Sequence, residues 1–185
     1  MSNKIRLASD ITHDSVVDGP GIRSVIWTQG CPHNCPECHN PETHDFNGGF
    51  FMEISNVINN LLKANKDITF SGGDPFCQPK ECAEIASAMQ MNGYSVWAYS
   101  GWTYEQLLEK SKNEPAIMDF LKNVDYLVDG PFVLAKKNLL LLFRGSSNQR
   151  IIDVQKSLVQ GKTVISDKYT DDYELKTEKP DGIFL

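Results

Sequence analysis

The sequence predicts an α/β fold with parallel strands, on three observations. Strand-like segments alternate with segments of helical periodicity, which is the pattern of parallel sheets whose strands are joined by helices. The 185 residues are 41% hydrophobic and 23% charged, enough for one domain with a sizeable core. No repeat, low-complexity segment or Gly/Ser linker divides the chain. We therefore expect one domain over residues 1–185, with the charged end, 169–185, as a candidate mobile tail.

Charge and hydropathy narrow the class of protein. The net charge is −6 and no long basic run occurs, which argues against nucleic acid as the main partner. The first residues are not followed by the apolar segment of an export signal, and no stretch approaches the ~18 apolar residues of a membrane span. Three of the five cysteines are clustered, which fits a reducing compartment and a metal centre better than a disulfide scaffold. We expect a cytoplasmic protein with no membrane partner.

The first predicted strand, residues 24–28, leads into the most distinctive stretch of the chain. A turn-forming run, residues 18–23, precedes the strand, and Gly30 after it frees the backbone to turn. The cysteine-rich loop, residues 31–40, therefore follows the carboxyl end of a strand. Active sites of α/β barrels form at that end, so the placement favours a catalytic role.

The remaining elements follow from periodicity and turn residues. Ile54, Val57, Ile58, Leu61 and Leu62 predict one apolar face of a helix, and a second helix begins at Pro79 and carries Cys82 on its core side. Thr103 and Gln106 form a capping-box pattern that opens a third helix. Further strands are predicted at residues 68–70, 95–99, 125–128, 151–152 and 164–165, and the apolar run 139–143 is interpreted as core, or as a docking patch if it is exposed.

Cys31, Cys35 and Cys38 are spaced C-x3-C-x2-C, so that one short loop can turn three thiolates toward one point. Soft thiolates select iron–sulfur clusters, zinc or copper(I) over hard cations. Three protein ligands leave one iron of a four-iron cluster without a protein ligand. An open position of this kind usually indicates chemistry at a metal site, whereas a closed one indicates structure.

Other interpretations of the loop stay open. Zinc could bind Cys31, Cys35, Cys38 and His39, with Cys77 and Cys82 as a distant second pair. Residues 35–39 also match the C-x-x-C-H pattern of c-type haem attachment, which normally occurs outside the cytoplasm. A disulfide within the loop would leave an odd thiol.

Polar residues and glycines follow the later strands. Gly72, Gly73 and Asp74 come directly after the strand at 68–70, where paired glycines let the backbone approach a ligand closely or simply form a turn. Asp129 ends the strand at 125–128 and either caps a turn or faces the site. The sequence assigns no role to Cys77, Arg144 or Arg150.

Residues 18–23, Gly30 and residues 31–43 together resemble the glycyl-radical-enzyme activases, which are radical S-adenosylmethionine (SAM) enzymes. Residues 128–132 (VDGPF) and 143–153 (FRGSSNQRIID) narrow the resemblance to the activating proteins of anaerobic (class III) ribonucleoside-triphosphate reductases. The chain departs from the wider family at Asp74, where Glu is usual. It also lacks the later G-x-I-x-G-x-x-E pattern, so the adenine and ribose contacts beyond the cysteine loop are unassigned.

The resemblance implies a set of site residues. Cys31, Cys35 and Cys38 would bind a [4Fe–4S] cluster, whose fourth iron is chelated by the amino and carboxylate groups of SAM. Cofactor contacts are implied as follows: adenosine against Glu37, Cys38 and His39; the methionine amine at Gly72, Gly73 and Asp74; and the methionine carboxylate near Asp129.

The implied reaction is one-electron chemistry carried by the cofactor and positioned by the protein. An external donor such as flavodoxin reduces the cluster, SAM is cleaved to methionine and a 5′-deoxyadenosyl radical, and that radical takes a hydrogen atom from a glycine Cα of the reductase. Alternatives are the activase of another glycyl radical enzyme of the pyruvate formate-lyase type, another small radical SAM enzyme with a small-molecule substrate, or a non-catalytic metal or iron–sulfur module. A full (β/α)8 barrel needs ~250 residues. We therefore expect an incomplete barrel of about five or six parallel strands, whose open side admits a loop of the partner.

Overall fold

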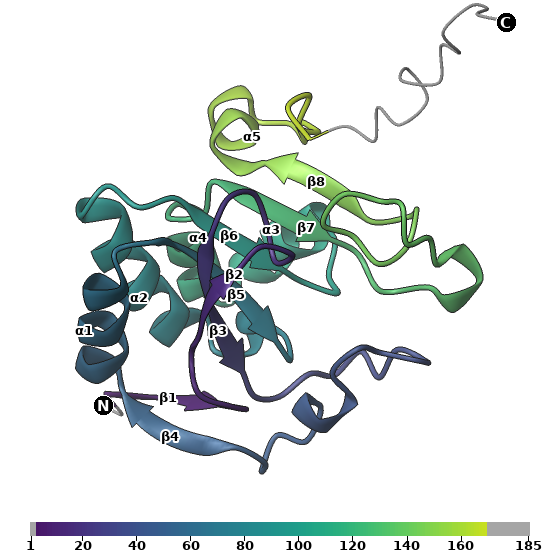
Figure 1. Ribbon diagram of the computed structural model, residues 1–185. Helices are drawn as coiled ribbons and strands as arrows, with labels where there is room; N and C mark the ends of the chain where they lie inside the picture. Colours follow the sequence, from purple (N-terminus) through teal and green to yellow (C-terminus); the bar gives the residue numbers. More distant parts are fainter. Residues whose placement is uncertain (1–2, 170–185) are drawn as a thin grey trace, which may run out of the picture.

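The computed structural model describes residues 3–169, and its strands form one mixed sheet of eight strands (Figure 1). Their order is β4-β1-β3-β5-β6-β7-β8, with β2 paired to β3 off this path. The strands are β1 (Lys4–Leu7), β2 (Thr12–Ser15), β3 (Arg23–Thr28), β4 (Phe50–Glu53), β5 (Asp67–Gly72), β6 (Val96–Tyr99), β7 (Tyr126–Asp129) and β8 (Arg150–Asp153).

The middle of the sheet is parallel and its edges are antiparallel. Strands β3, β5, β6 and β7 pair in parallel, whereas β8 pairs antiparallel to β7, and β1, β2 and β4 form antiparallel pairs at the other side. The prediction of an α/β fold with parallel strands is confirmed. The count of five or six parallel strands is wrong, since the described residues form four. The chain returns from β7 to β8 without the crossover helix that a parallel pair requires.

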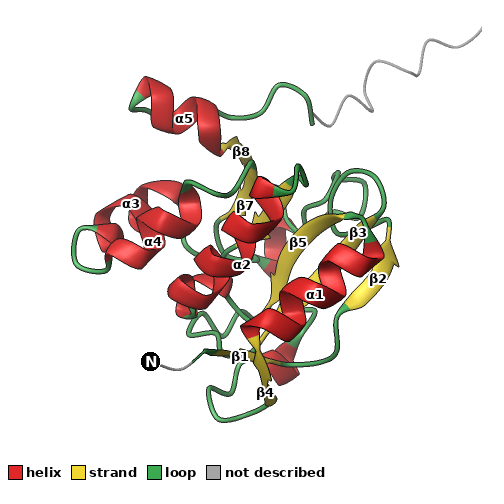
Figure 2. Ribbon diagram, turned by 90° about the vertical axis from the view of Figure 1, so that its left-hand side faces the viewer, coloured by secondary structure: helices red, strands yellow, loops and turns green. Residues whose placement is uncertain are grey.

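Helices cover one face of the sheet, as Figure 2 shows for α1, α2, α3 and α4. A continuous apolar core lies between these helices and the sheet, and no helix within residues 3–169 is long and apolar enough to cross a membrane. The helices are α1 (Ile54–Ala64), α2 (Pro79–Met91), α3 (Tyr104–Ser111), α4 (Pro115–Leu121) and α5 (Val154–Gln160), with short 3-10 turns η1 (Pro41–Thr43), η2 (Pro75–Cys77) and η3 (Leu134–Lys136).

Local sequence signals account for the helix boundaries. The Thr103 side chain accepts a hydrogen bond from the Gln106 backbone N–H, and the Gln106 side chain accepts one from the Thr103 N–H, which confirms the predicted capping box. Helix α2 begins with Pro79 at its first position, and Cys82 is fully buried in the core, as predicted. Helix α1 ends at Asn65 in the left-handed conformation.

The interpretation of residues 139–143 as core is wrong. Leu139 and Leu140 are 85% and 65% exposed, and only Phe143 packs inward, 5.7 Å from the Trp97 ring, in a small aromatic cluster on the sheet face opposite the helices. The run lies in the loop between β7 and β8, beyond an isolated bridge between Lys137 and Ser146. The run is apolar, but it projects past the sheet, and no second layer among residues 3–169 covers it.

Two smaller predictions concern the end of the chain. The strand predicted at 151–152 is β8, whereas residues 164–165 contribute only an isolated bridge between Ile165 and Ile152. The predicted tail, 169–185, lies outside the described residues apart from Tyr169.

The turn-forming run before β3 is fastened by a buried arginine. The Arg23 guanidinium donates hydrogen bonds to Thr69 Oγ1 (2.8 Å), to the Ser95 carbonyl (2.9 Å) and to the Pro20 carbonyl (3.2 Å). Its side chain is almost fully buried, and this burial lowers its pKa. Arg23 therefore ties the turn to the beginnings of β5 and β6, at the end of the sheet away from the cysteine loop.

Replacing Arg23 with Met should lower the free energy of unfolding by about 3 kcal/mol, because buried carbonyl groups lose their donor. Chemical denaturation measures the change. The control is Lys122→Met, which removes an exposed cation and should change stability by less than about 0.5 kcal/mol. Equal stability of the two variants would contradict this account of Arg23.

Candidate metal and cofactor site

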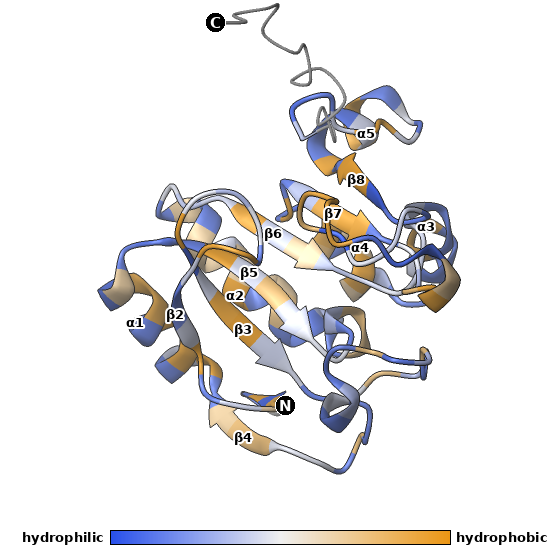
Figure 3. Cartoon of the chain, turned by 45° about the vertical axis from the view of Figure 1, so that its right-hand side comes forward, coloured by the Kyte–Doolittle hydropathy of each residue, from blue (hydrophilic) through white to orange (hydrophobic). Residues whose placement is uncertain are grey.

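The cysteine loop leaves the carboxyl end of β3, as predicted, and runs across the lower right of Figure 1. Gly30 adopts φ +100°, the left-handed region that lets the chain turn away from the strand. The Gly30 and Cys31 N–H groups then donate to the carbonyls of Thr43 (2.8 Å) and His44 (3.2 Å). In Figure 3, β3 and β5 are hydrophobic in their middles and pale at their arrowheads, so the sheet becomes more polar toward this loop.

Three thiols share this loop. Cys31, Cys35 and Cys38 are all partly exposed, and all five cysteines of the chain are free. Burial raises the pKa of Cys31 to about 11, with smaller contributions from Cys35 and Cys38, and burial also raises the pKa of Cys35, with a smaller contribution from Cys38. The three sulfur atoms therefore lie in one neighbourhood.

The chemistry of this donor set fits an iron–sulfur cluster. Left-handed Asn34 (φ 47°) and Glu37 (φ 57°) turn the backbone between successive cysteines, and the Cys38 N–H donates to the Cys35 carbonyl (3.1 Å). Soft sulfur donors on a tightly turned loop are the ligands that such clusters use. Within residues 3–169, however, no three His, Cys, Asp or Glu side chains already stand in a metal-binding arrangement, so the three-cysteine ligand set stays a prediction.

Gly72 and Gly73 let the end of β5 touch the start of the cysteine loop. A Cβ atom on Gly72 would lie 2.5 Å from the Thr28 carbonyl oxygen, and one on Gly73 would lie 2.5 Å from that of Gly30. The Gly73 N–H donates to the Thr28 carbonyl (2.7 Å). The close backbone approach expected from paired glycines is present, with the chain's own backbone as the partner. Their contact with the cofactor stays a prediction.

Asp74 joins three strand ends through one buried carboxylate. Its Oδ2 accepts hydrogen bonds from the Gly101 N–H (2.9 Å) and from Ser100 Oγ (3.0 Å), both beyond β6. The same oxygen pairs with His33 Nε2 (2.9 Å) of the cysteine loop, while Oδ1 accepts from the Phe76 N–H (3.0 Å). The carboxylate is fully buried and well supplied with donors, as burial of a charge requires.

Asp129 is likewise occupied by the protein. Its carboxylate accepts from the Tyr104 N–H (2.7 Å), which opens α3, and from Arg150 Nε (3.0 Å). Arg150 also donates to Glu105 Oε2 (2.7 Å), and this hydrogen bond is the main reason that the pKa of Glu105 falls to about 2. Asp129 thus joins the start of α3 to β8. Its predicted place near the methionine carboxylate is not tested by these contacts.

The loop between β7 and β8 meets the cysteine loop at Phe132. The His39 ring lies 5.5 Å from the Phe132 ring, measured between ring centroids. Sequence analysis did not single out Phe132, Ser100 or His33. The available signal was position, because Ser100 and Phe132 follow the carboxyl ends of neighbouring parallel strands.

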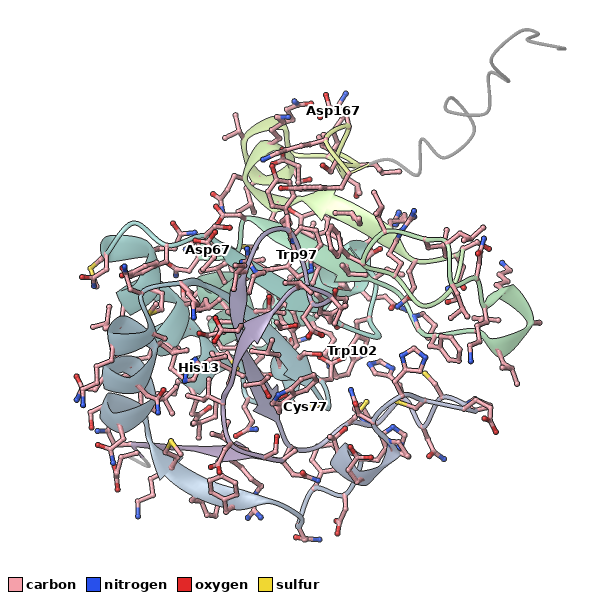
Figure 4. All side chains as sticks on the ribbon, in the orientation of Figure 1. His13, Asp67, Cys77, Trp97, Trp102 and Asp167 are labelled. Carbon is pink, nitrogen blue, oxygen red and sulfur yellow. The ribbon has the colours of Figure 1, made fainter. Side chains whose placement is uncertain are left out.

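The other two cysteines differ in their surroundings. Cys77 ends η2, close enough to interact with Cys31, and burial raises its pKa to about 12; Figure 4 labels it. Cys82 is fully buried in the core. The prediction that Cys82 is a core residue is therefore confirmed.

A cavity of about 600 Å³ lies away from this site. Its lining includes Arg23, Asp67, Ser95 and Tyr126, which lie at the amino ends of the parallel strands. The cysteine loop is at the opposite ends. The shape of the protein surface therefore does not by itself identify the site, and the chemistry of the side chains does.

A search of known proteins found one family model and a set of curated relatives. The model, described as a 4Fe-4S single cluster domain, matches residues 17–152. The anaerobic ribonucleoside-triphosphate reductase-activating proteins of Salmonella typhi and Escherichia coli (strain K12) are 33% and 32% identical over 145 residues, which are 72% of this chain and 90% of each relative. The pyruvate formate-lyase-activating enzyme of Clostridium pasteurianum is 31% identical over 118 residues, 60% of this chain and 50% of that protein.

Among solved structures, QueE from Escherichia coli superposes with a TM-score of 0.44 at 14% identity, covering 54% of this chain and 53% of QueE. The family model spans residues 17–152, which include the cysteine loop and strands β3, β5, β6 and β7, and the reductase-activating relatives cover 72% of this chain. The chain therefore belongs to the 4Fe-4S single cluster domain family, within the group of anaerobic ribonucleoside-triphosphate reductase-activating proteins.

Proposed function

We propose that this protein is a radical SAM enzyme that activates an anaerobic ribonucleoside-triphosphate reductase by generating a glycyl radical on it. The observation that carries the proposal is the loop of Cys31, Cys35 and Cys38 at the carboxyl end of β3, in a chain that is 33% identical to a reductase-activating protein. The bound cluster and SAM supply one-electron cleavage of the C5′–S bond, whose radical product removes a hydrogen atom from a glycine Cα.

The protein's own residues bind and orient the cofactors. Cys31, Cys35 and Cys38 would hold the cluster, and Glu37, Cys38 and His39 would lie against the adenosine. The end of β5, at Gly72, Gly73 and Asp74, would bind the methionine amine. Because the Asp74 carboxylate already accepts several hydrogen bonds, the backbone of this segment is the more available partner. Asp129 is proposed near the methionine carboxylate, with Arg150 between it and solvent-exposed Glu105.

We further propose that the sheet is an incomplete barrel that works as one domain. Its strand order runs from β4 to β8 without closure among residues 3–169, which leaves a side on which a loop of another protein could enter. An external one-electron donor such as flavodoxin, a cytoplasmic location and the lack of a nucleic-acid partner complete the proposal.

A second candidate is activation of a pyruvate formate-lyase type of enzyme. The match to the Clostridium pasteurianum enzyme supports it, although that match spans only half of the relative. Incubation with each purified enzyme under the same reducing conditions, followed by detection of the glycyl radical, separates the two candidates.

The exposed leucines of the β7–β8 loop are proposed to contact the reductase. Leu139, Leu140 and Leu142 project from this loop, which lies on the same side of the molecule as the cysteine loop (Figure 1). Phe132, at the base of the same loop, touches the cysteine loop directly. A partner segment lying over these leucines would be continuous with the site at which its glycine must react.

After anaerobic reconstitution with iron and sulfide, the dithionite-reduced protein should cleave SAM to 5′-deoxyadenosine. Cys35→Ala should abolish the product because one cluster ligand is lost. Cys82→Ala is the matched control, since Cys82 is a core residue away from the loop, and it should retain activity. Stoichiometric zinc in the purified protein, with no 5′-deoxyadenosine formed, would establish a structural metal site instead.

The double variant Leu139→Ser, Leu140→Ser should lower the glycyl radical yield on the reductase roughly tenfold, as expected for losing apolar interface contacts worth more than ~1 kcal/mol in total. Its cleavage of SAM without the reductase should stay within about twofold of the wild type, because the cofactor contacts remain. Met91→Ser removes an equally exposed apolar side chain from the end of α2 and serves as the control. Unchanged radical yield and complex formation in the double variant would exclude this surface.

A further inference from the structure

His33 occupies a closely fitted position between the cysteine loop and the end of β6. Its ring lies edge-on to Trp102, with 4.4 Å between ring centroids. A Cβ atom on Gly101 would lie 2.3 Å from the same ring, so only glycine leaves room for it. The side chain is 16% exposed, which means that the ring is enclosed by the protein and not displayed to a substrate.

The polar contact of this ring is the buried carboxylate of Asp74. Nε2 of His33 and Oδ2 of Asp74 are 2.9 Å apart. A carboxylate can only accept, so Nε2 carries the hydrogen in this contact. Asp74 keeps its donors from Phe76, Ser100 and Gly101 whatever His33 does. The pair therefore matters less for satisfying Asp74 than for holding His33.

His33 is also part of the loop that carries the thiols. It stands between Cys31 and Cys35, two residues from each of these thiols in the sequence. The side chain and the main chain of one residue thus point to different parts of the site. The side chain reaches the ends of β5 and β6, and the main chain leads to a proposed cluster ligand on either side.

We propose that His33 is a positioning residue, which fixes the cysteine loop against residues 72–74 and residues 100–102 so that the cluster and SAM are held at a fixed separation. The proposal rests on the proposed function, since it takes the loop to bind the cluster. Groups that orient metal ligands in this way commonly contribute 10- to 100-fold to metal affinity or activity, which sets the size of the expected effect at ~10-fold or more.

The test compares His33→Leu with His33→Gln in the full chain, reconstituted anaerobically with iron and sulfide. One readout is the rate at which a chelator removes iron. A second is the SAM concentration that changes the electron paramagnetic resonance spectrum of the reduced cluster. His33→Leu should raise the rate of iron removal and the required SAM concentration about tenfold each, because it removes the donor to Asp74. His33→Gln keeps an N–H donor and should recover much of the loss.

Two further variants separate positioning from general stability. Gly101→Ala leaves His33 intact but places a methyl group where the ring lies, so it should reproduce the His33→Leu values. His13→Leu is the matched control: its ring nitrogens contact Ser24 Oγ (2.8 Å) and Asn60 Oδ1 (2.9 Å), on the side of the sheet near α1 (Figure 4). It should behave as the wild type does.

Each outcome bears on a different claim. His33 has no positioning role if His33→Leu and Gly101→Ala both match the wild type in two quantities. These are the rate of iron removal by the chelator and the SAM concentration that changes the spectrum. If His13→Leu is impaired to the same degree, the effect is one of overall stability and the proposal is overturned. If the wild-type protein assembles no iron–sulfur cluster, the proposed function is overturned as well. If the wild type assembles the cluster and the His33 variants behave as it does, only the inference about His33 is overturned.

Discussion

The burial of the Asp74 carboxylate is the constraint on which the site depends. A charge removed from water must be surrounded by donors, and here those donors come from the ends of different strands. The requirement draws together the turn after β5 and the turn after β6, and the contact with His33 attaches the cysteine loop after β3 to them. The contact between His33 and Asp74, together with the close approach of the β5 glycines, joins the cysteine loop to these turns.

A similar arrangement recurs at the end of β7, two strands further along the sheet from β5. Asp129 accepts from the first N–H of α3 and from Arg150, which brings β8 against the end of β7. Buried carboxylates at the ends of β5 and β7 thus serve the architecture of the loops. Any ligand that binds here meets carboxylates that are already oriented and already hydrogen-bonded. These two carboxylates are oriented in advance, whereas the three thiols of the cysteine loop do not yet stand in a metal-binding arrangement.

Much of the fold could be predicted from the sequence, because its signals are local. Helical periodicity located α1, the capping box located the start of α3, and β-rich composition located the parallel strands. Strand β2, with the polar sequence Thr-His-Asp-Ser, has no such signal and forms through its pairing with β3. The antiparallel direction of β8 depends on the path of the chain between β7 and β8, and residue composition does not predict that path. The leucines at 139–142 were misplaced because an apolar run does not say whether a second layer exists to cover it.

At the site, sequence reasoning located the thiols and the glycines but not what holds them. The spacing of cysteines in the sequence directly indicates metal ligands. The contacts of His33, Ser100 and Phe132, in contrast, form only when strands distant in the sequence become neighbours in the sheet. This difference has a physical cause. The three thiols that would bind the cluster are close together in the sequence, whereas most of the residues that position them are distant in it. The extent of the domain and the cofactor contacts remain predictions of the same kind.

The outer edge of β8 has a further consequence for assembly. An unpaired edge strand invites other chains to add to the sheet. Here the Asp153 N–H donates to the Val164 carbonyl (2.9 Å) and the Ser166 N–H donates to the Ile151 carbonyl (2.8 Å), so residues 164–166 already use backbone groups of β8. A partner protein is thereby steered away from strand addition at this edge.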